Sequence, residues 1–298
     1  MSQNRTIPPP LADLEDLISA ALREDGDGVD VTSDLTVPSD AIDECVLLAR
    51  EPGVFAGRAV LEAFALRFAD EGLGVEVHVA DGQAVGAGQA LAALSGPART
   101  ILRIERPLLN FLQRLCGIAT MTRQFVEAVA GTSATILDTR KTVPGFRALD
   151  KYAVRCGGGA NHRMGLHDAV LVKDNHLAGV PVGQLRGFVS DLVARAKQHD
   201  PKPAFVEVEV DAIDQLREVL AAEGVDRVLL DNFSADEMRQ AVALRNATPG
   251  EPVRLEASGR VDLGNVRAIA ETGVDFISVG ALTHSVQALD LAIESQSS

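Results

Sequence analysis

The second half of the chain contains six short apolar runs, and each ends on a polar residue or glycine, or one residue after a polar residue. Apolar runs of this length, separated by helical patterns, are typical of buried parallel strands in α/β folds. Because the carboxyl ends of parallel strands meet at one edge, where α/β barrels carry their active sites, the residues that end these runs are predicted to form a site. The runs are ILDTRK (136–141), AVLVK (169–173), FVEVEV (205–210), RVLLD (227–231), RLEAS (254–258) and FISVG (276–280).

The first third of the chain mixes helical periodicity with short strands, which predicts a small α+β unit with antiparallel strands. The polar stretch at 25–36 is interpreted as a turn, because it lacks the final acidic ligand of a calcium loop. The predicted elements are a helix at 11–25, a strand at 45–50, a helix at 57–68 and strands at 75–79 and 88–96.

A helical stretch at 99–120 connects the two patterns and carries a line of arginines that ends at Arg106. Pro107 interrupts it, since proline lacks a backbone donor and disfavours helical geometry at the preceding residue. The helix is therefore expected either to kink or to begin there. Later helices are predicted at 211–222 and 235–245.

The composition is that of a globular protein with one large domain or two ordinary ones, because 46% of its 298 residues are hydrophobic. No apolar stretch is long enough to cross a bilayer, and the first residues lack the apolar core of a secretory signal. The three cysteines are far apart and odd in number, which argues against a disulfide framework. A cytoplasmic location is expected.

The net charge of −14 argues against a nucleic acid or an anionic membrane as a partner.

One segment departs from this acidic balance. Between Asp138 and His176 there are seven Lys or Arg residues, four Asp residues and three of the six histidines. A basic segment in an acidic protein favours a small anionic ligand. Arginine grips carboxylate oxygens in pairs, so the strand-end cations suit two carboxylates, or one carboxylate and phosphates. These cations are Arg140, Lys141, His162 when it is protonated, Arg163 and Lys173.

Two carboxylates, Glu209 and Asp231, end separate strands at matching depth. Such a pair typically binds a hydrated Mg²⁺ that is held mainly by substrate phosphates. Glu207 shares the face of Glu209, because residues two apart in a strand point the same way. Glu209 is the favoured ligand, since it lies nearer the edge.

The loops at 257–259 and 279–281 are suited to phosphate. They follow the last two predicted strands and lead into helices, which is where barrels often bind phosphate. Neither a GxGxxG sequence nor a P-loop is present, so dinucleotide and Walker-type sites are not supported. The triple glycine at 157–159 either lets a loop approach the ligand or forms a simple turn.

Two other functions are compatible with parts of this pattern. Lys173 at a barrel strand end could form the Schiff base of an aldolase, although an aldolase does not need so many cations around one ligand. A non-catalytic anion-binding protein of the same fold is the second alternative.

The residues at the strand ends resemble those of the quinolinate phosphoribosyltransferase family. The resemblance extends from about residue 11 to 290 and is most specific at 138–176. It implies the decarboxylating transfer of a phosphoribosyl group to quinolinate in de novo NAD synthesis. The matching segments are DTRKTVPGFRALDKYAVRCGGGANHRMGLHDAVLVKDNH, VEVEVD, LLDNF, EASG and VGALTHS.

The resemblance also implies a fold, an N-terminal α/β sandwich domain followed by the incomplete, open α/β barrel of type II phosphoribosyltransferases. We expect the sandwich at 1–118, the barrel at 119–284 and a final helix at 285–298 that returns to the sandwich. The implied active unit is a homodimer, or a higher oligomer, in which Arg106 is contributed by the neighbouring subunit.

The family assigns roles to the candidate residues, with Thr139 included among those that bind substrate. The carboxylates of quinolinate are expected at Arg140, His162, Arg163 and Lys173. Phosphoribosyl pyrophosphate and Mg²⁺ are expected at the catalytic residues Lys141, Glu209 and Asp231. The 5′-phosphate is expected at Ser258, Gly259, Arg260, Val279, Gly280 and Ala281.

Two residues depart from the usual pattern of the family. Arg260 stands where many relatives have a small or neutral residue, so it is expected either to add charge to the phosphate loop or to point away. Pro107 stands where a helix former is usual, which leaves the position of Arg106 open.

Overall fold

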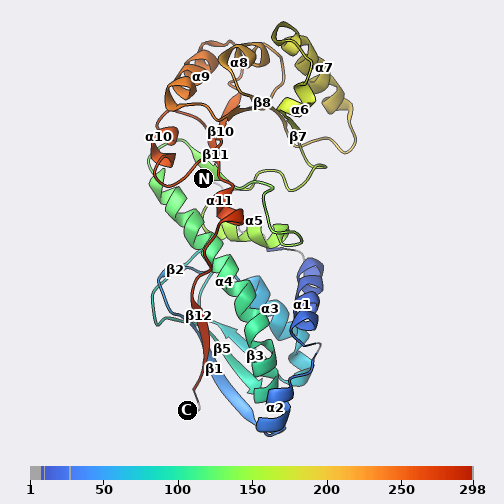
Figure 1. Cartoon of the computed structure of the whole chain (residues 1–298), viewed down its shortest axis with the longest axis vertical. Helices are drawn as coiled ribbons and strands as arrows, with labels where there is room; N and C mark the ends of the chain where they lie inside the picture. Colours follow the sequence, from blue (N-terminus) through green and yellow to red (C-terminus); the bar gives the residue numbers. More distant parts are fainter. Residues whose placement is uncertain (1–7, 10, 27, 297–298) are drawn as a thin grey trace. The chain divides into compact units, whose positions relative to one another are not determined.

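The computed structural model describes residues 8–9, 11–26 and 28–296, which form two compact units (Figure 1). Among these residues, unit 1 comprises the chain up to Arg123, residues 142–158 and the chain from Ser285. Unit 2 comprises residues 124–141 and 159–284. Residues 142–158, which the predicted division assigned to the barrel, thus group with unit 1.

Unit 1 contains an antiparallel sheet in the strand order β12-β1-β5-β3, as the alternating pattern predicts for this part of the chain. A second, two-stranded sheet joins β2 to β4. The strands are β1 (Ile42–Ala49), β2 (Gly53–Val54), β3 (Gly74–Val77), β4 (Ala84–Val85), β5 (Ala90–Pro97) and β12 (Leu291–Ser295).

The three helices predicted in unit 1 are present, and among its described residues the unit contains three further helices that were not predicted. The stretch interpreted as a turn contains a short helix, which begins where the Asp30 carboxylate accepts a hydrogen bond from the backbone N–H of Ser33 at 3.1 Å. The helices are α1 (Leu11–Asp25), α2 (Val31–Thr36), α3 (Arg58–Arg67), the 3₁₀ helix η1 (Ala69–Glu71), α4 (Ala98–Ala128, whose last residues belong to unit 2) and α5 (Arg147–Cys156).

Pro107 lies inside α4 and does not begin it, so that alternative is wrong. The helix continues on both sides of the proline because its apolar side is buried, including Ile104, Leu108 and Leu112. Burial of this stripe outweighs the single backbone hydrogen bond that proline removes.

The final segment is a strand, and the predicted helix at 285–298 is wrong. Strand β12 pairs antiparallel with β1, so that Leu291 lies opposite Ala49 and Ser295 opposite Cys45. The unpaired edge of β1 offers backbone partners that a local helix pattern does not reveal. Residues 297 and 298 lie outside the described residues.

Unit 2 contains a six-stranded parallel sheet in the order β6-β11-β10-β9-β8-β7, which confirms all six predicted strands. No pairing joins β6 to β7 among the described residues, so the barrel is open, as expected. The strands are β6 (Thr135–Leu137), β7 (Val170–Val172), β8 (Val206–Val210), β9 (Arg227–Asp231), β10 (Arg254–Ser258) and β11 (Phe276–Ser278).

Helices connect these strands, and α7, α8 and α9 follow one another around the outside of the sheet (Figure 1). A capping box at Ser234 and Glu237 begins α9. No described helix is long and apolar enough to cross a membrane. The helices are α6 (Asp174–Leu177), the 3₁₀ helix η2 (Val182–Gln184), α7 (Leu185–Gln198), α8 (Ile213–Leu220), α9 (Ala235–Ala247), α10 (Val266–Ala270) and α11 (Ala281–His284).

Candidate active site

Four of the predicted strand-end residues lie on one face of the parallel sheet. Ser258 of β10 is in register with Asp231 of β9, and Glu209 of β8 is in register with Leu229, two residues before Asp231. Lys173 directly follows β7, on the face of Leu171, which is in register with Glu207. The alternation of side chains along each strand therefore brings Lys173, Glu209, Asp231 and Ser258 to one edge, as the sequence predicts.

Lys173 and Glu209 form an ion pair across this edge. The ammonium nitrogen lies 2.8 Å from Oε2 of Glu209, with 45% of the lysine side chain and 12% of the glutamate side chain exposed. Glu209 and Asp231 also line one hollow of about 240 Å³, together with Asp174 and Asp211. The two carboxylates proposed as metal ligands are thus brought to the same cavity.

Asn232, which sequence reasoning did not single out, holds the end of β9 against the end of β10. Its side-chain amide donates to Oδ2 of Asp231 at 2.8 Å, and its backbone N–H donates to the carbonyl of Ser258 at 2.9 Å. Its φ of 57° lies in the left-handed region, which asparagine tolerates better than most residues. Asparagine at this position in the motif LLDNF is the sequence signal that could have identified it.

Gly259 gives Asn232 the space it needs. The φ of Gly259 is +99°, and a Cβ atom added there would lie 2.3 Å from Oδ1 of Asn232. Arg260 follows with a φ of 49°, and its carbonyl accepts a hydrogen bond from the side chain of Asn265 at 2.9 Å. Gly259, Arg260, Asn232 and Asn265 line a hollow of about 560 Å³. Arg260 therefore borders the predicted phosphate loop.

Strand β6 ends at Leu137, so Arg140 and Lys141 lie in the loop beyond it and not in the predicted strand 136–141. The strand ends here because Asp138, which is fully buried, turns its carboxylate to the neighbouring loop. It accepts hydrogen bonds from the side chain of Asn161 at 2.5 Å and from the backbone N–H of His162 at 2.9 Å. Asp138 is a second residue that the sequence analysis missed, and its place at the end of an apolar run was the available signal.

The loop after β6 meets the loop after β11. Thr139 accepts a hydrogen bond from the backbone N–H of Lys141 at 3.0 Å, and the carbonyl of Lys141 accepts one from the hydroxyl of Thr283 at 2.8 Å. A Cβ atom on Gly280 would lie 3.1 Å from Cδ of Lys141 and 3.1 Å from Nε2 of His284. The Lys141 side chain thus lies beside the predicted phosphate loop, where Val279 is buried and Ala281 begins α11.

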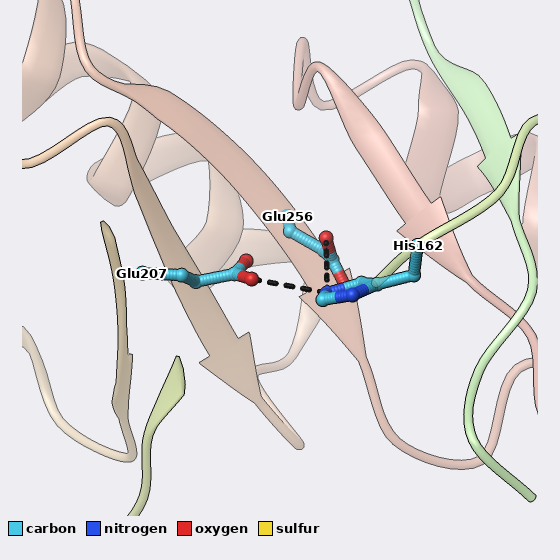
Figure 2. A group of neighbouring side chains, drawn as sticks. All are labelled: His162, Glu207 and Glu256. Carbon is cyan, nitrogen blue, oxygen red and sulfur yellow. Dashed lines mark ion pairs between the residues drawn. The ribbon is translucent and has the colours of Figure 1, made fainter. Parts of the chain in front are cut away.

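His162 faces two buried glutamates of the sheet, Glu207 of β8 and Glu256 of β10 (Figure 2). Its Nε2 lies 3.0 Å from Oε2 of Glu207 and 3.6 Å from Oε2 of Glu256, and 7% of the histidine side chain is exposed. Both glutamates lie two residues deeper in their strands than Glu209 and Ser258. Glu207 is the deeper residue of its pair, as expected, but its closeness to His162 was not foreseen.

Burial shifts both glutamates toward the protonated form. Loss of hydration raises the pKa of Glu256 to about 8, and the neighbouring Glu207 adds to this rise. Burial likewise raises the pKa of Glu207 to about 7, against the opposing effect of Arg227. These two carboxyl groups therefore titrate close to neutral pH.

Arg163 is largely buried beside His162, and one of its guanidinium nitrogens donates to the carbonyl of Ala169 at 3.1 Å. Burial lowers the pKa of Arg163 from its ordinary value, and the nearby Arg140 lowers it further. Two guanidinium groups close enough to repel each other are suited to a dianionic ligand, because each can grip a carboxylate.

Arg106 belongs to unit 1 and lies on the surface of α4, where 62% of its side chain is exposed. Its nearest acidic partner is the adjacent Glu105, at 3.7 Å. An arginine held this loosely is free to contact another molecule, because an exposed ion pair of this length contributes little.

Comparison with known proteins agrees with this geometry. Residues 118–294 match the family model described as "Quinolinate phosphoribosyl transferase, C-terminal domain", and residues 30–116 match the corresponding N-terminal domain. The chain is 44% identical over 285 residues to the "Nicotinate-nucleotide pyrophosphorylase [carboxylating]" of Mycobacterium leprae, which covers 94% of this chain and 96% of the relative.

Two further relatives give the same result. A protein of Bacillus subtilis, "Probable nicotinate-nucleotide pyrophosphorylase [carboxylating]", is 42% identical over 267 residues, which is 88% of each chain. The solved structure of the nicotinate-nucleotide pyrophosphorylase from Francisella tularensis superposes with a TM-score of 0.86 at 38% identity, over 96% of this chain and 97% of the other.

Proposed function

Because this chain belongs to the quinolinate phosphoribosyltransferase family, we propose that it transfers a phosphoribosyl group to quinolinate with loss of CO₂, in the de novo synthesis of NAD. The products are nicotinate mononucleotide, CO₂ and pyrophosphate. The observation that carries this proposal is the single sheet edge where cations, carboxylates and two glycine loops converge.

The cations of the edge bind quinolinate. Arg140, Arg163 and Lys173 surround its two carboxylates, and His162 lies behind Arg163. Thr139 shapes the turn that carries Arg140. The paired N–H groups of arginine match a carboxylate, so two arginines select a ring with two acidic groups over one with a single group.

Phosphoribosyl pyrophosphate occupies the remainder of the edge. Lys141, Glu209 and Asp231 act on its pyrophosphate and ribose. Its 5′-phosphate binds to the two loops, where glycines permit a close approach of backbone N–H groups to phosphate. The loop residues are Ser258, Gly259 and Arg260 after β10, and Val279, Gly280 and Ala281 after β11.

The reaction requires positioning and electrostatic stabilisation more than proton transfer. The quinolinate nitrogen attacks the anomeric carbon, the C–O bond to pyrophosphate breaks, and positive charge develops on the ribose. Glu209 or Asp231 stabilises this charge. Decarboxylation then leaves an electron pair on the ring carbon beside the cationic nitrogen, and a proton replaces CO₂. Lys141 stabilises the leaving pyrophosphate or this carbanion.

The donor set at the edge fits Mg²⁺. Glu209 and Asp231 offer carboxylate oxygens at one hollow, and Mg²⁺ prefers such ligands when most of its shell comes from water and phosphate. These two residues would hold the ion, which supplies charge neutralisation for the pyrophosphate.

The active unit is a homodimer in which Arg106 serves the neighbouring subunit. Support comes from its exposure and from the exposed apolar residues Val29, Val31 and Leu102, which line a hollow of about 630 Å³ in the same unit. Exposed apolar clusters of this kind often mark subunit interfaces. Co-expressed Arg106→Ala and Asp231→Ala subunits should regain activity that each variant alone lacks. The absence of any recovery, with mixed dimers verified, contradicts the shared site.

The function is tested with the purified chain, quinolinate, phosphoribosyl pyrophosphate and Mg²⁺. We expect CO₂ and pyrophosphate in equal amounts, and little product from nicotinate, which has one carboxylate. Arg140→Ala should lose most quinolinate turnover and remain folded by circular dichroism. Near-normal kcat/KM in that variant would refute the assignment. Failure of the wild-type chain to release pyrophosphate would favour an anion-binding protein.

The Schiff-base alternative is not supported. A Schiff-base lysine is typically activated by desolvation in an apolar pocket, whereas Lys173 pairs with Glu209 at 2.8 Å and 45% of its side chain is exposed. Borohydride trapping of a carbonyl substrate on Lys173 would be needed to restore that alternative.

A further inference from the structure

We propose that Glu207 and Glu256 are positioning residues, which hold His162 in its neutral Nε2–H tautomer and so fix Arg163 for the carboxylate substrate (Figure 2). This inference rests on the proposed function, because it assigns the two glutamates a role in the same quinolinate site. Neither glutamate is among the strand-end residues that reach the functional edge.

The tautomer follows from the contacts of the two ring nitrogens. Nδ1 of His162 accepts a hydrogen bond from the backbone N–H of Arg163 at 2.7 Å, so this nitrogen carries a lone pair and no proton. The ring proton then resides on Nε2, which lies 3.0 Å from Oε2 of Glu207. None of the four carboxyl oxygens of Glu207 and Glu256 has a hydrogen-bond partner among the described residues, so the two buried groups act on this nitrogen by electrostatic attraction to its N–H. Glu256, at 3.6 Å, flanks the same nitrogen.

The ring is also fixed by packing. Phe205 lies edge-on to the imidazole, with 5.6 Å between the ring centroids. The guanidinium of Arg227 is stacked between Phe205 and Phe276, at 4.1 Å and 4.5 Å from their centroids. The positive charge of Arg227, which is held in this stack, attracts both Glu207 and Glu256. The imidazole therefore has contacts that determine its orientation as well as its tautomer.

The orientation of His162 determines the position of Arg163. Its backbone N–H is engaged by His162, and its guanidinium donates to the carbonyl of Ala169 at 3.1 Å. The preceding peptide is held as well, since the backbone N–H of His162 donates to Asp138 at 2.9 Å. If His162 turned or carried a second proton, Nδ1–H would oppose the N–H of Arg163 and displace it. The glutamates thus act on the substrate through two intervening residues.

The same contacts argue against a metal ion at this cluster. One nitrogen of His162 and one oxygen of each glutamate lie within 4.8 Å of one another, a spacing that could suit a divalent cation. A metal would need the lone pair of Nε2, and neutral histidine would then carry its proton on Nδ1, against the N–H of Arg163. With the proton on Nε2, this N–H faces two carboxyl groups and Nδ1 accepts from Arg163, whereas a bound metal would leave the N–H groups of Nδ1 and Arg163 facing each other.

The tautomer can be measured directly in the wild-type chain. In protein labelled with ¹⁵N at both histidine ring nitrogens, long-range proton–nitrogen correlation spectra distinguish protonated from unprotonated nitrogens. We expect the His162 signals, assigned by their absence from His162→Asn, to show a protonated Nε2 and an unprotonated Nδ1 at neutral pH. A doubly protonated ring or an Nδ1–H tautomer overturns the proposal. So does a shift of these signals when Zn²⁺ or Mn²⁺ is added at equimolar concentration.

Kinetics test the link to the substrate. Glu207→Leu removes the carboxyl group beside Nε2 and should raise KM for quinolinate by about 10- to 100-fold, the range seen when supporting residues of other sites are replaced. KM for phosphoribosyl pyrophosphate should change by less than about twofold, because Glu207 contacts His162, which is not among the residues assigned to that substrate. Glu207→Gln, whose amide oxygen can still attract the Nε2–H group, should restore most of the affinity. An unchanged KM for quinolinate in Glu207→Leu, or equal increases for both substrates, refutes the positioning role.

A matched control separates positioning from stability. Asp275→Asn also replaces a carboxylate, which directly precedes β11, but it breaks the ion pairs with Arg245 (2.7 Å) and Arg254 (2.8 Å) at the opposite edge of the sheet. It should lower Tm and leave both KM values unchanged. If the wild-type chain shows no turnover, the proposed function fails, and the NMR result still decides the tautomer.

Discussion

Replacing Gly259 by alanine should disturb the edge of the sheet through one methyl group. Gly259 has a φ of +99°, which residues with a side chain rarely adopt. The new Cβ would lie 2.3 Å from Oδ1 and 2.7 Å from Cγ of Asn232. Asn232 would have to move, and its hydrogen bond to Asp231 would be lost with it.

The magnitude follows from these contacts. The left-handed backbone costs alanine about 1 to 2 kcal/mol, and the lost hydrogen bond costs about 0.5 to 1.5 kcal/mol. Alanine also restricts the unfolded chain, which offsets about 0.4 to 1 kcal/mol. We expect the free energy of unfolding to fall by about 0.5 to 3 kcal/mol. KM for phosphoribosyl pyrophosphate should rise more than KM for quinolinate, because Asp231 is released.

Urea denaturation and steady-state kinetics measure these two effects. Gly187→Ala is the control, since Gly187 lies in α7 with no atom near its added Cβ and should gain about 0.5 to 1 kcal/mol from helix propensity. The two alanine substitutions should therefore change stability in opposite directions. An unfolding free energy of Gly259→Ala equal to or above that of the wild type would refute this reasoning.

Three further predictions concern the same face. Glu256 binds a proton more tightly in the folded than in the unfolded protein, because burial raises its pKa to about 8. Its contribution to stability is therefore complete below about pH 4.5 and is lost as pH rises toward about 8. Glu256→Gln should flatten the fall in Tm between pH 5 and pH 8 in scanning calorimetry, and an unchanged slope would contradict the shifted pKa. Asp138→Ala removes the acceptor for the backbone N–H of His162 and should raise KM for quinolinate about tenfold. Steady-state kinetics measure this effect, and an unaffected KM would contradict the prediction. Gly280→Ala should crowd Lys141 and weaken phosphoribosyl pyrophosphate binding in isothermal titration calorimetry, whereas unaltered affinity would show that the loop can relax.

The parallel sheet could be predicted from the sequence because its strands are buried on both faces and read as apolar runs. The alternation of side chains then placed Glu209 and Asp231 at one edge without any knowledge of tertiary contacts. The final strand could not be predicted in the same way. β12 forms because β1 offers it a partner about 240 residues earlier in the chain, and no local pattern records that pairing.

The sequence predicted those site residues that end a strand. It did not reveal the residues that act by holding a neighbouring residue in place. Asp138 and Asn232 bind no predicted ligand, but they hold the loops that carry His162 and the phosphate site. Glu207 was identified only by its face, and its contact with His162 depends on a segment that returns to the sheet 25 residues after the end of β6 (162 − 137). Such contacts depend on how loops fold back, which residue type and spacing do not encode.

The acidic residues beneath the edge give a physical reason why its cations are in place before a substrate arrives. A cluster of basic groups repels itself, as the effect of Arg140 on Arg163 indicates. Glu209 offsets this repulsion at Lys173 by an ion pair. Asp138 holds the loop of Arg163 by a hydrogen bond from the backbone of His162, and Glu207 lies 3.0 Å from the ring of His162. The lysine ammonium has three donors and uses one on Glu209, so it can bind a carboxylate and keep its position. The charged side chains of the edge therefore need to move little when a dianionic substrate binds. Electrostatic stabilisation is most effective when the charged groups are already in place.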